Sequence, residues 1–350
     1  MKMDVSSIDK NFIVNTNIDK EGVVFYNAED ASKFRLYGLF REGELLRRIP
    51  EEVARATNDG VYNLHAHAAG GRVRFVTDSP YVALYAKYGV ASKMPHFTFT
   101  ASMGFDLYSE EKYIKTFIPP VNTDNLYTGV VDIPASLHTY TLNLPLYSSL
   151  TELHIGVKEG SRIEPAADYT YTTPIVYYGS SITQGGCASR PGTSYQSIIS
   201  RRFDADYVNL GFSGSARGED SIVDYIAGLN MSIFVCDYDH NAPTYEHLEA
   251  THEKLYRKVR ALHPDLPIIM VSRPNYYRRV DELRRADLIR ANYEKAVSEG
   301  DKNVYHVDGA DMIGADIADI AHVDGTHPND VGFAAMAKVI GDTIAKILKK

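Results

Sequence analysis

A serine between a predicted strand and a predicted helix is the first group in this chain that could carry chemistry. Ser181 lies in the stretch 177–185, YYGSSITQG, after the β-branched and aromatic run Ile175–Tyr178. That run predicts a buried strand, and a helical pattern follows at Ser194–Arg202. Such a turn holds a hydroxyl at a sheet edge, where backbone N–H groups can stabilise an oxyanion. The alternative is a glycine-rich turn with two incidental serines.

A second reactive pair lies near the C-terminus, where Asp324 and His327 are three residues apart in the stretch DGTHPN. A serine nucleophile needs an imidazole to accept its proton, and the imidazole needs an acceptor that fixes its tautomer. One tight turn could supply both groups. The alternative is a helix N-terminus with Asn329 or Asp330 as the cap and His327 on the surface.

The second half of the chain alternates strand-like and helix-like stretches, which would position these groups. Five strands are predicted at Pro174–Tyr178, Tyr207–Leu210, Ser232–Cys236, Pro267–Val271 and Asn303–Val307. Helices are predicted at Ser194–Arg202, Ser221–Ala227, Tyr245–Leu262, Asp281–Glu299 and Pro328–Leu348. This alternation predicts a three-layer α/β fold with a doubly wound, parallel five-stranded sheet. Ligands of such sheets bind beyond the carboxyl ends of the strands, which places Ser181 and the loops after Leu210 and Cys236 on one rim.

The first half reads as all-β. Short alternating segments occur at Arg72–Thr77, Tyr81–Tyr85, His96–Thr100, Tyr113–Ile118, Tyr140–Leu144 and Leu153–Val157. Turn formers separate them, a pattern that predicts a sandwich or jelly roll. Residues 51–57 are expected to form one or two helical turns, and 159–173 a linker. We therefore predict two domains, a β-sandwich at 1–165 and a catalytic α/β domain at 166–350.

Composition narrows the class of protein. The chain has 350 residues, 44% hydrophobic and 23% charged, with a net charge of −8. No basic block is present, which argues against a nucleic-acid or anionic-membrane partner. No apolar run reaches the length of a membrane span, and residues 1–20 lack the apolar core of a signal peptide. We expect a cytoplasmic protein, or a secreted one if a signal has been removed.

Two other kinds of site are disfavoured. His65 and His67 have ligand-like spacing but no obvious third partner, so we expect neither a metal nor another cofactor. Cys187 and Cys236 are the only cysteines, and two do not make a disulfide framework. An α/β-hydrolase would need Gly-x-Ser-x-Gly, and no such pentapeptide occurs.

Taken in order, four segments resemble the motif blocks of the SGNH (GDSL-like) hydrolase family. They are Gly179-Ser180-Ser181, the stretch 209–214 (NLGFSG), the stretch 237–241 (DYDHN) and Asp324-x-x-His327. The resemblance covers about residues 173–350. Two departures stand out. Ser180 replaces the usual Asp of the first block, and the third block lacks its usual glycine and trailing Asp.

The resemblance implies a set of roles. Ser181, at the third position of its block, would be the nucleophile, His327 the general base and Asp324 its partner. The oxyanion would be held by the N–H groups of Ser181 and Gly214 and by the side-chain amide of Asn241. No cofactor is implied.

A second resemblance lies in the first half. The stretch 103–108, MGFDLY, is similar to the Gly-x-Asp-Leu-Tyr signature of a β-sandwich domain found ahead of SGNH domains. Two-domain carbohydrate esterases have this architecture, which implies a substrate-binding or lid role for the β-domain. Asp106 and Tyr108 would then bind substrate. Tyr238 and His240 are further candidates for substrate binding, and Asp239 and His240 are expected to shape the pocket wall. The alternative is a strand end, with Asp106 in a turn and Tyr108 in the core.

The expected function is a serine esterase that removes O-acetyl groups from carbohydrate through an acyl-enzyme, as in hemicellulose degradation. The expected partner is an acetylated oligosaccharide derived from xylan or mannan, and the site could be completed across a homodimer. Alternatives are a lipid esterase or thioesterase of the same family, or a non-catalytic carbohydrate-binding protein. Retention of Ser181, Asp324 and His327 together argues against the non-catalytic alternative.

Overall fold

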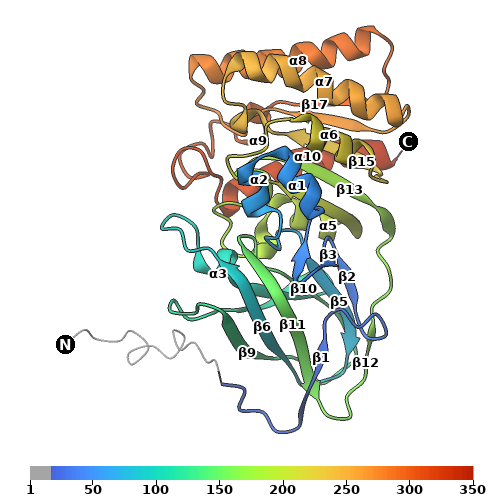
Figure 1. Cartoon of the computed structure of the whole chain (residues 1–350), viewed down its shortest axis with the longest axis vertical. Coiled ribbons are helices and arrows are strands. Elements are labelled where there is room, and N and C mark those ends of the chain that lie inside the picture. The colour runs from blue at the N-terminus through green and yellow to red at the C-terminus, as the bar shows by residue number, and fades with distance from the viewer. Residues whose placement is uncertain (1–16, 350) are drawn as a thin grey trace, which may run out of the picture.

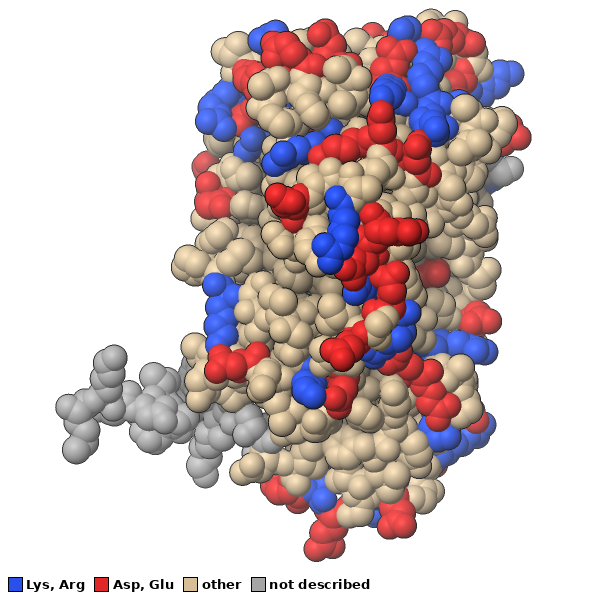
Figure 2. All heavy atoms as spheres, in the orientation of Figure 1, with Lys and Arg blue, Asp and Glu red and all other residues tan. Residues whose placement is uncertain are grey.

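The computed structural model describes residues 17–349, and the polar N-terminal segment 1–16 lies outside them. The α/β half of the molecule is at the top of Figure 1 and the β half at the bottom, so that the chain is elongated. Among the described helices, none is long and apolar enough to cross a membrane. Acidic and basic side chains are interspersed over the face drawn in Figure 2, without a basic stripe.

The β half is built on two antiparallel sheets, as predicted. One sheet has the order β1-β11-β6-β9, with bounds Val23–Asn27, Ser148–Lys158, Tyr81–Ala91 and Leu126–Asp132. The other has the order β12-β5-β10-β7-β8, with bounds Ile163–Pro165, Arg72–Thr77, His138–Asn143, Phe105–Ser109 and Lys112–Phe117. A short strand β2 (Arg35–Tyr37) also pairs with β5, and β3 (Phe40–Glu42) forms a hairpin with β4 (Leu45–Arg47).

Strand alternation decides which side chains face the core of this half. On β5, Val73 and Phe75 are fully buried in the core between the sheets, opposite Leu142 and Tyr140 of β10. Alternate residues of a strand point to opposite faces. The intervening residues of β5 and β10 therefore face the other way, towards the α/β half.

The predicted strand at His96–Thr100 is wrong. A turn occupies 95–97 and is followed by the short helix α3 (Phe99–Ser102), capped by the Thr98 hydroxyl. The hydroxyls of Thr98 and Thr100 donate to backbone carbonyls at Ala188 and Ser189 in the other half of the chain. Contacts distant in sequence thus override the local alternating pattern. The expected linker 159–173 also contains a strand, β12.

The α/β half contains the predicted parallel sheet of five strands, in the order β14-β13-β15-β16-β17. Their bounds are Ala205–Gly211, Tyr171–Gly179, Ile233–Asp237, Ile268–Val271 and Val304–Val307. Helices α6 (Asp220–Ala227), α7 (Tyr245–Leu262) and α8 (Val280–Ser298) pack on one face, and α5 (Tyr195–Phe203) and α10 (Asp330–Leu348) on the other. Shorter turns are α4 (Ser181–Gln184), α9 (Gly309–Met312), η3 (Pro191–Thr193) and η4 (Asp239–Asn241).

Register aligns the carboxyl ends of three strands. Along β13, Tyr177 packs towards α5 and α10, while Tyr178 packs towards α6 and α7. Burial on both faces explains why the strand reads as a continuous apolar run. Gly179 pairs with Gly211 of β14 and Asp237 of β15, so all three strands end at one level. We call this edge and the loops that follow it the rim.

The two halves share hydrophobic cores. Helices α1 (Glu51–Thr57) and α2 (Asp59–Leu64) belong to the first half in sequence, yet Ala54 and Val61 are buried in the same core as Tyr178. Figure 1 shows both helices at the junction of the halves. The predicted boundary at 165/166 falls between β12 and β13. It remains a prediction: the core between the two β sheets is made only of first-half residues, whereas both cores of the α/β half include residues of the first half.

A buried arginine also ties the first half to the rim. Arg48 is 2% exposed, and its guanidinium donates to the carbonyls of Leu64, Asn209 and Gly211 at 2.7, 3.2 and 2.5 Å. Burial lowers the pKa of Arg48 to about 9. The end of β14 is therefore held by a residue of the first half.

Candidate active site

The turn that carries Ser181 depends on a glycine. A Cβ atom at Gly179 would lie 2.1 Å from the carbonyl oxygen of Asp237, so no other residue fits where β13 ends beside β15. The next residue, Ser180, accepts a hydrogen bond from the N–H of Ile182 at 3.1 Å and caps helix α4. The hydroxyl of Ser180 is thereby occupied, whereas Ser181 is 8% exposed at the rim.

Three predicted residues form one chain of hydrogen bonds. The Oγ of Ser181 lies 2.9 Å from Nε2 of His327. The Nδ1 of the same ring lies 2.8 Å from Oδ2 of Asp324. This is the geometry in which a carboxylate fixes the tautomer of an imidazole that accepts a serine proton.

The turn between Asp324 and His327 is arranged around the carboxylate. Oδ1 of Asp324 accepts the N–H groups of Thr326 and His327 at 3.0 and 2.8 Å. Burial alone would raise the pKa of Asp324, but the hydrogen bonds from the backbone and ring of His327 and from Thr326 outweigh it. They lower that pKa to about 2. Asp324 is therefore a stable anion beside the imidazole.

The predicted oxyanion donors approach the same rim. Gly214 has a φ of +68°, a left-handed conformation that favours glycine, and its N–H makes no hydrogen bond among the described residues. The neighbouring N–H of Ser213 donates to Oε1 of Gln184 at 3.0 Å, which holds this loop against α4. The Oδ1 of Asn241 accepts the N–H of Ala216 at 3.3 Å. This bond leaves the amide NH₂ of Asn241 as a donor.

The loop after β16 supports the catalytic turn and was missed in the sequence. The guanidinium of Arg273 donates to Oγ1 of Thr326 at 3.0 Å, and its other end pairs with Glu282 at 2.7 Å. The side chain of Asn275 donates to the carbonyl of Gly325 at 3.4 Å. Because Arg273 follows a parallel strand, the strand-end rule could have found it.

The β half contributes a wall beside His327. The rings of His96 and Phe97 lie 5.7 and 5.6 Å from the His327 ring, between centroids. The Phe97 ring lies 4.7 Å from that of Tyr147, whose hydroxyl donates to the carbonyl of Ser181 at 3.2 Å. Nothing local in the sequence signalled these contacts, since the 96–100 segment resembled a strand.

Asp106 and Tyr108 do not lie at the rim, and we withdraw them as residues that bind the ester. Asp106 is fully buried and accepts hydrogen bonds from Asn143 and from the N–H of Gly192, both at 2.8 Å. Tyr108 is 3% exposed, and its ring is covered by the guanidinium of Arg201 at 4.1 Å. These contacts join the β half to α5 and to the segment before it. We call this contact, together with the ion pair of Arg72 and Asp206, the seam.

The two remaining candidates for substrate binding, Tyr238 and His240, lie in different surroundings. Tyr238 is 1% exposed, and its hydroxyl shares a hydrogen bond with Thr251 at 2.8 Å, so it is a core residue and is also withdrawn. His240 is half-buried next to Asn241 and lines a cavity of about 380 Å³ with Arg273 and other charged residues. Burial, followed by the charge of Arg273, lowers the pKa of His240 well below its usual value. It stays a candidate wall residue in its neutral form.

One group of three side chains in residues 17–349 has donor atoms close enough for a metal: His96, Cys187 and His327, all within 4.8 Å of one another. The thiol of Cys187 donates to the carbonyl of His96 at 3.4 Å. Burial, followed by the charge of Asp324, raises its pKa to about 12, which disfavours the thiolate that a metal needs. Both nitrogens of His327 are also engaged, so this group fits a metal poorly.

The earlier candidate pair does not form a metal site either. Nδ1 of His67 bonds to Nε2 of Gln184 at 3.2 Å, and burial lowers the pKa of His67 to about 3. His65 instead contacts Arg47 and the carbonyl of Tyr62. The two imidazoles therefore serve separate structural contacts.

Two family profiles match this chain. The GDSL-like Lipase/Acylhydrolase family matches residues 172–345, and GxDLY, the N-terminus of Esterase_SGNH_hydro-type proteins, matches residues 23–163. A search of curated proteins gives no match.

Solved structures share the whole two-part architecture. A provisionally assigned GDSL-like lipase from Bacteroides ovatus is 28% identical with a TM-score of 0.84, covering 93% of this chain and 98% of its own. The salicylyl-acyltransferase SsfX3 from a tetracycline biosynthetic pathway is 20% identical with a TM-score of 0.77, covering 94% and 98%. The acetyl xylan esterase Est2A from Butyrivibrio proteoclasticus is 12% identical with a TM-score of 0.58, covering 93% and 99%. The last two likenesses concern the fold alone.

Proposed function

Because this chain belongs to the GDSL-like lipase/acylhydrolase family and carries its N-terminal GxDLY domain, we propose that it is a serine esterase with Ser181 as nucleophile. The observation that carries the proposal is the continuous chain of hydrogen bonds from Ser181 through His327 to Asp324. A carbohydrate-binding protein without activity would have no use for this arrangement.

The geometry supports acyl transfer in two steps. His327 accepts the hydroxyl proton as Oγ of Ser181 attacks the ester carbonyl, and then gives the proton to the departing alcohol. Asp324, with its lowered pKa, stabilises the imidazolium formed in between. A water molecule, deprotonated by the same ring, then hydrolyses the acyl-enzyme.

Three donors can stabilise the tetrahedral oxyanion. The N–H of Ser181 lies at the start of α4, and that of Gly214 makes no other described hydrogen bond. The third donor is the amide of Asn241, oriented by the N–H of Ala216. Donors that are already in place when negative charge develops are worth more than donors that must reorganise.

The acyl group is proposed to be short, with acetyl as the best candidate. The pair Ser181–His327 is bordered by two aromatic rings: Phe97 lies 5.6 Å from the His327 ring and 4.7 Å from the ring of Tyr147. The carbonyl of Ser181 is also tied to the hydroxyl of Tyr147. An aromatic wall so close to the nucleophile favours a small acyl group.

The alcohol is proposed to be a carbohydrate, such as a xylan- or mannan-derived oligosaccharide. Support comes from the wall that the β half adds beside His327, since a second domain at the rim can grip an extended chain. A family two carbohydrate esterase from Clostridium thermocellum, solved with cellohexaose, has the same two-part fold at 15% identity and a TM-score of 0.56. A homodimer that completes the site remains a prediction.

One observation favours a second candidate, a lipid esterase or thioesterase. Large apolar side chains are exposed on the loops that flank the catalytic turn, with Tyr276 45%, Tyr277 60% and Val323 48% exposed. Exposed apolar patches mark interaction sites, and this patch could bind the acyl chain of a lipid or thioester substrate.

The test is a comparison of substrates. Hydrolysis of p-nitrophenyl acetate, butyrate and octanoate would be measured, together with mass spectrometry of acetylated xylo- and manno-oligosaccharides before and after treatment. We expect loss of 42 Da per acetyl group and a rate that falls with acyl length. Faster turnover of octanoate would favour the lipid candidate, and no turnover of any ester would exclude an esterase.

A further inference from the structure

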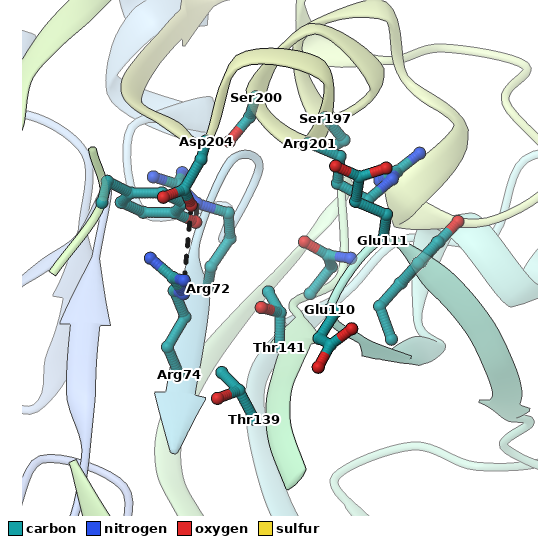
Figure 3. Close-up of a pocket in the computed structure, with 13 residues that line it drawn as sticks. Arg72, Arg74, Glu110, Glu111, Thr139, Thr141, Ser197, Ser200, Arg201 and Asp204 are labelled. Carbon is teal, nitrogen blue, oxygen red and sulfur yellow. Dashed lines mark hydrogen bonds and ion pairs between the residues drawn. The ribbon is translucent and has the colours of Figure 1, made fainter. Parts of the chain in front are cut away.

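A second hollow lies at the seam, on the edge of the parallel sheet opposite the rim (Figure 3). Asp204 lines it and directly precedes β14, which runs from Ala205 to Gly211. Gly211 is paired with Gly179, next to the catalytic serine turn. Six residue steps of about 3.3 Å separate the two ends, so the hollow is roughly 20 Å from the rim along this strand.

The floor of the hollow is a row of polar side chains on three paired strands. Register places Arg74 of β5 opposite Thr141 of β10, and Thr141 opposite Tyr108 of β7. Thr139 lies on the same face of β10 as Thr141. No hydrogen bond of either threonine hydroxyl is present among the described side chains, so both are available to a ligand.

The roof comes from helix α5. Ser197, Ser200 and Arg201 face the hollow at helical spacing, and Asp204 follows at the end of the helix. Figure 3 shows Arg74 with Asp204 on one side, Arg201 with Glu111 on the other, and the two threonines between them. The hollow encloses about 260 Å³.

The guanidinium of Arg74 lies over the ring of Tyr169 at 3.9 Å but has few hydrogen-bond partners. Arg74 is 9% exposed, and only one of its terminal nitrogens has a partner, Asp204 at 3.4 Å. Its Nε and other terminal nitrogen are buried without any partner. Buried donors are nearly always paired, so a partner for these N–H groups is to be expected at this position.

We propose that this hollow is an ancillary binding site for a sugar ring. Its lining carries charges of both signs: Arg74 and Arg201 accompany Asp204, Glu110 and Glu111, while Arg72 is already paired with Asp206, which does not line the hollow. A lone anion would meet the carboxylates, and a lone cation would meet the guanidinium groups. A neutral ligand rich in hydroxyl groups can donate to the carboxylates and accept from the arginines at the same time.

The volume sets the size of the ligand. About 260 Å³ is slightly below the range of roughly 300–1,000 Å³ typical of small-molecule sites, which suits one sugar ring and part of the next. This inference rests on the proposed carbohydrate substrate, because a sugar held here would anchor a chain whose acetylated part lies elsewhere.

The test is direct binding, separate from turnover. Xylobiose, mannobiose and cellobiose, which carry no ester, would be titrated calorimetrically into the full chain with Ser181 blocked by phenylmethanesulfonyl fluoride. We expect millimolar or tighter binding to at least one disaccharide. Arg74→Gln should weaken it by about tenfold or more, since hydrogen bonds to charged groups are the stronger ones. Thr141→Tyr should abolish it by filling the hollow.

Thr151→Tyr is the matched control, because Thr151 lines a different hollow of the β half and this change should leave binding intact. Thermal melts would show that each variant is folded. If Arg74→Gln does not fold, the effect of Thr141→Tyr on disaccharide binding is by itself the test of the proposal. The proposal is overturned if no disaccharide binds, if binding survives Thr141→Tyr, or if Thr151→Tyr removes it. Hydrolysis of p-nitrophenyl acetate by the unblocked protein reports on the esterase separately, so either proposal can fail without the other.

Discussion

Asp106 and Asp324 stand in two short motifs of this chain, and the fold treats them in opposite ways. Asp106, at the seam, is fully buried, and this burial raises its pKa to about 6 despite hydrogen bonds from Asn143 and Gly192. Asp324, at the rim, has a side chain 36% exposed and a pKa lowered to about 2. The carboxyl group of an aspartate is therefore costly to ionise at position 106 and easily ionised at position 324.

The difference in ionisation matches two different roles, a structural one for Asp106 and a proposed catalytic one for Asp324. The lone pairs of Asp106 are used to join two segments that are 86 residues apart in the chain. Asp324 accepts two backbone N–H groups with one oxygen, while its other oxygen faces the catalytic imidazole. A carboxylate that must stabilise a transient cation needs to be ionised, whereas one that ties strands together only needs to accept hydrogen bonds.

The largest effect is expected at the rim. Ser181→Ala should lower kcat for p-nitrophenyl acetate by about 10³–10⁶, because no other group can form the acyl-enzyme. Ser180→Ala is the control. It removes a helix cap worth about 0.5–2 kcal/mol of stability but should keep most of the activity. Full activity in Ser181→Ala would overturn the proposed function.

Asp324→Asn should lower kcat by about 10⁴ with little change in fold, because an amide cannot stabilise the imidazolium or fix the same tautomer. The carboxylate's pKa is depressed in the fold, so its contribution to stability is present above about pH 4 and is lost as pH falls towards 2. Stopped assays at neutral pH and denaturant unfolding in that acidic window would measure both effects. A kcat within tenfold of the wild type would remove Asp324 from the mechanism.

Asn241→Ala should lower kcat by about 10²–10³, the usual cost of one oxyanion donor, while KM changes little. The loss of the bond to Ala216 is a smaller, structural effect, and a thermal melt would separate it from catalysis. A decrease in kcat below threefold would show that another donor holds the oxyanion.

The sequence predicts the elements of the fold that local residue patterns determine. It fails where contacts between residues distant in sequence determine the structure. Helix α7 was predicted at its observed bounds, because eighteen residues of amphipathic pattern need no distant information. The strands of the parallel sheet are apolar on both faces and were also found. In the β half, β1, β7, β9 and the short strands β2, β3, β4 and β12 were missed. The stretch 96–100 was predicted as a strand although Thr98 and Thr100 bond to the other half.

The candidate site shows the same division. Ser181, Asp324 and His327 were predicted from motif order, and the structure brings their side chains together, although their roles remain to be tested. Arg273 could have been found from the strand-end rule. Phe97 and Tyr147 could not, because Phe97 contacts His327 and Tyr147 contacts Ser181 only through packing between halves that are distant in sequence.

The smallest effect on turnover is expected at the seam. Asp106→Ala should leave kcat of the folded protein unchanged and lower the free energy of unfolding by about 1–3 kcal/mol for each buried donor left unpaired. Asp168→Ala is a control in an exposed ion pair with Arg35, where the loss should stay below about 1 kcal/mol.

The loss of stability in Asp106→Ala should depend on pH in the opposite sense to the contribution of Asp324 at the rim. Because the fold raises the pKa of Asp106 to about 6, its favourable contribution is complete below about pH 4 and is lost as pH rises through 6. The stability difference between wild type and Asp106→Ala should therefore be larger at pH 4.5 than at pH 7.5, the reverse of the trend for Asp324. Urea unfolding at the two pH values measures it. A variant of unchanged stability and reduced kcat would instead return Asp106 to the set of substrate-binding residues.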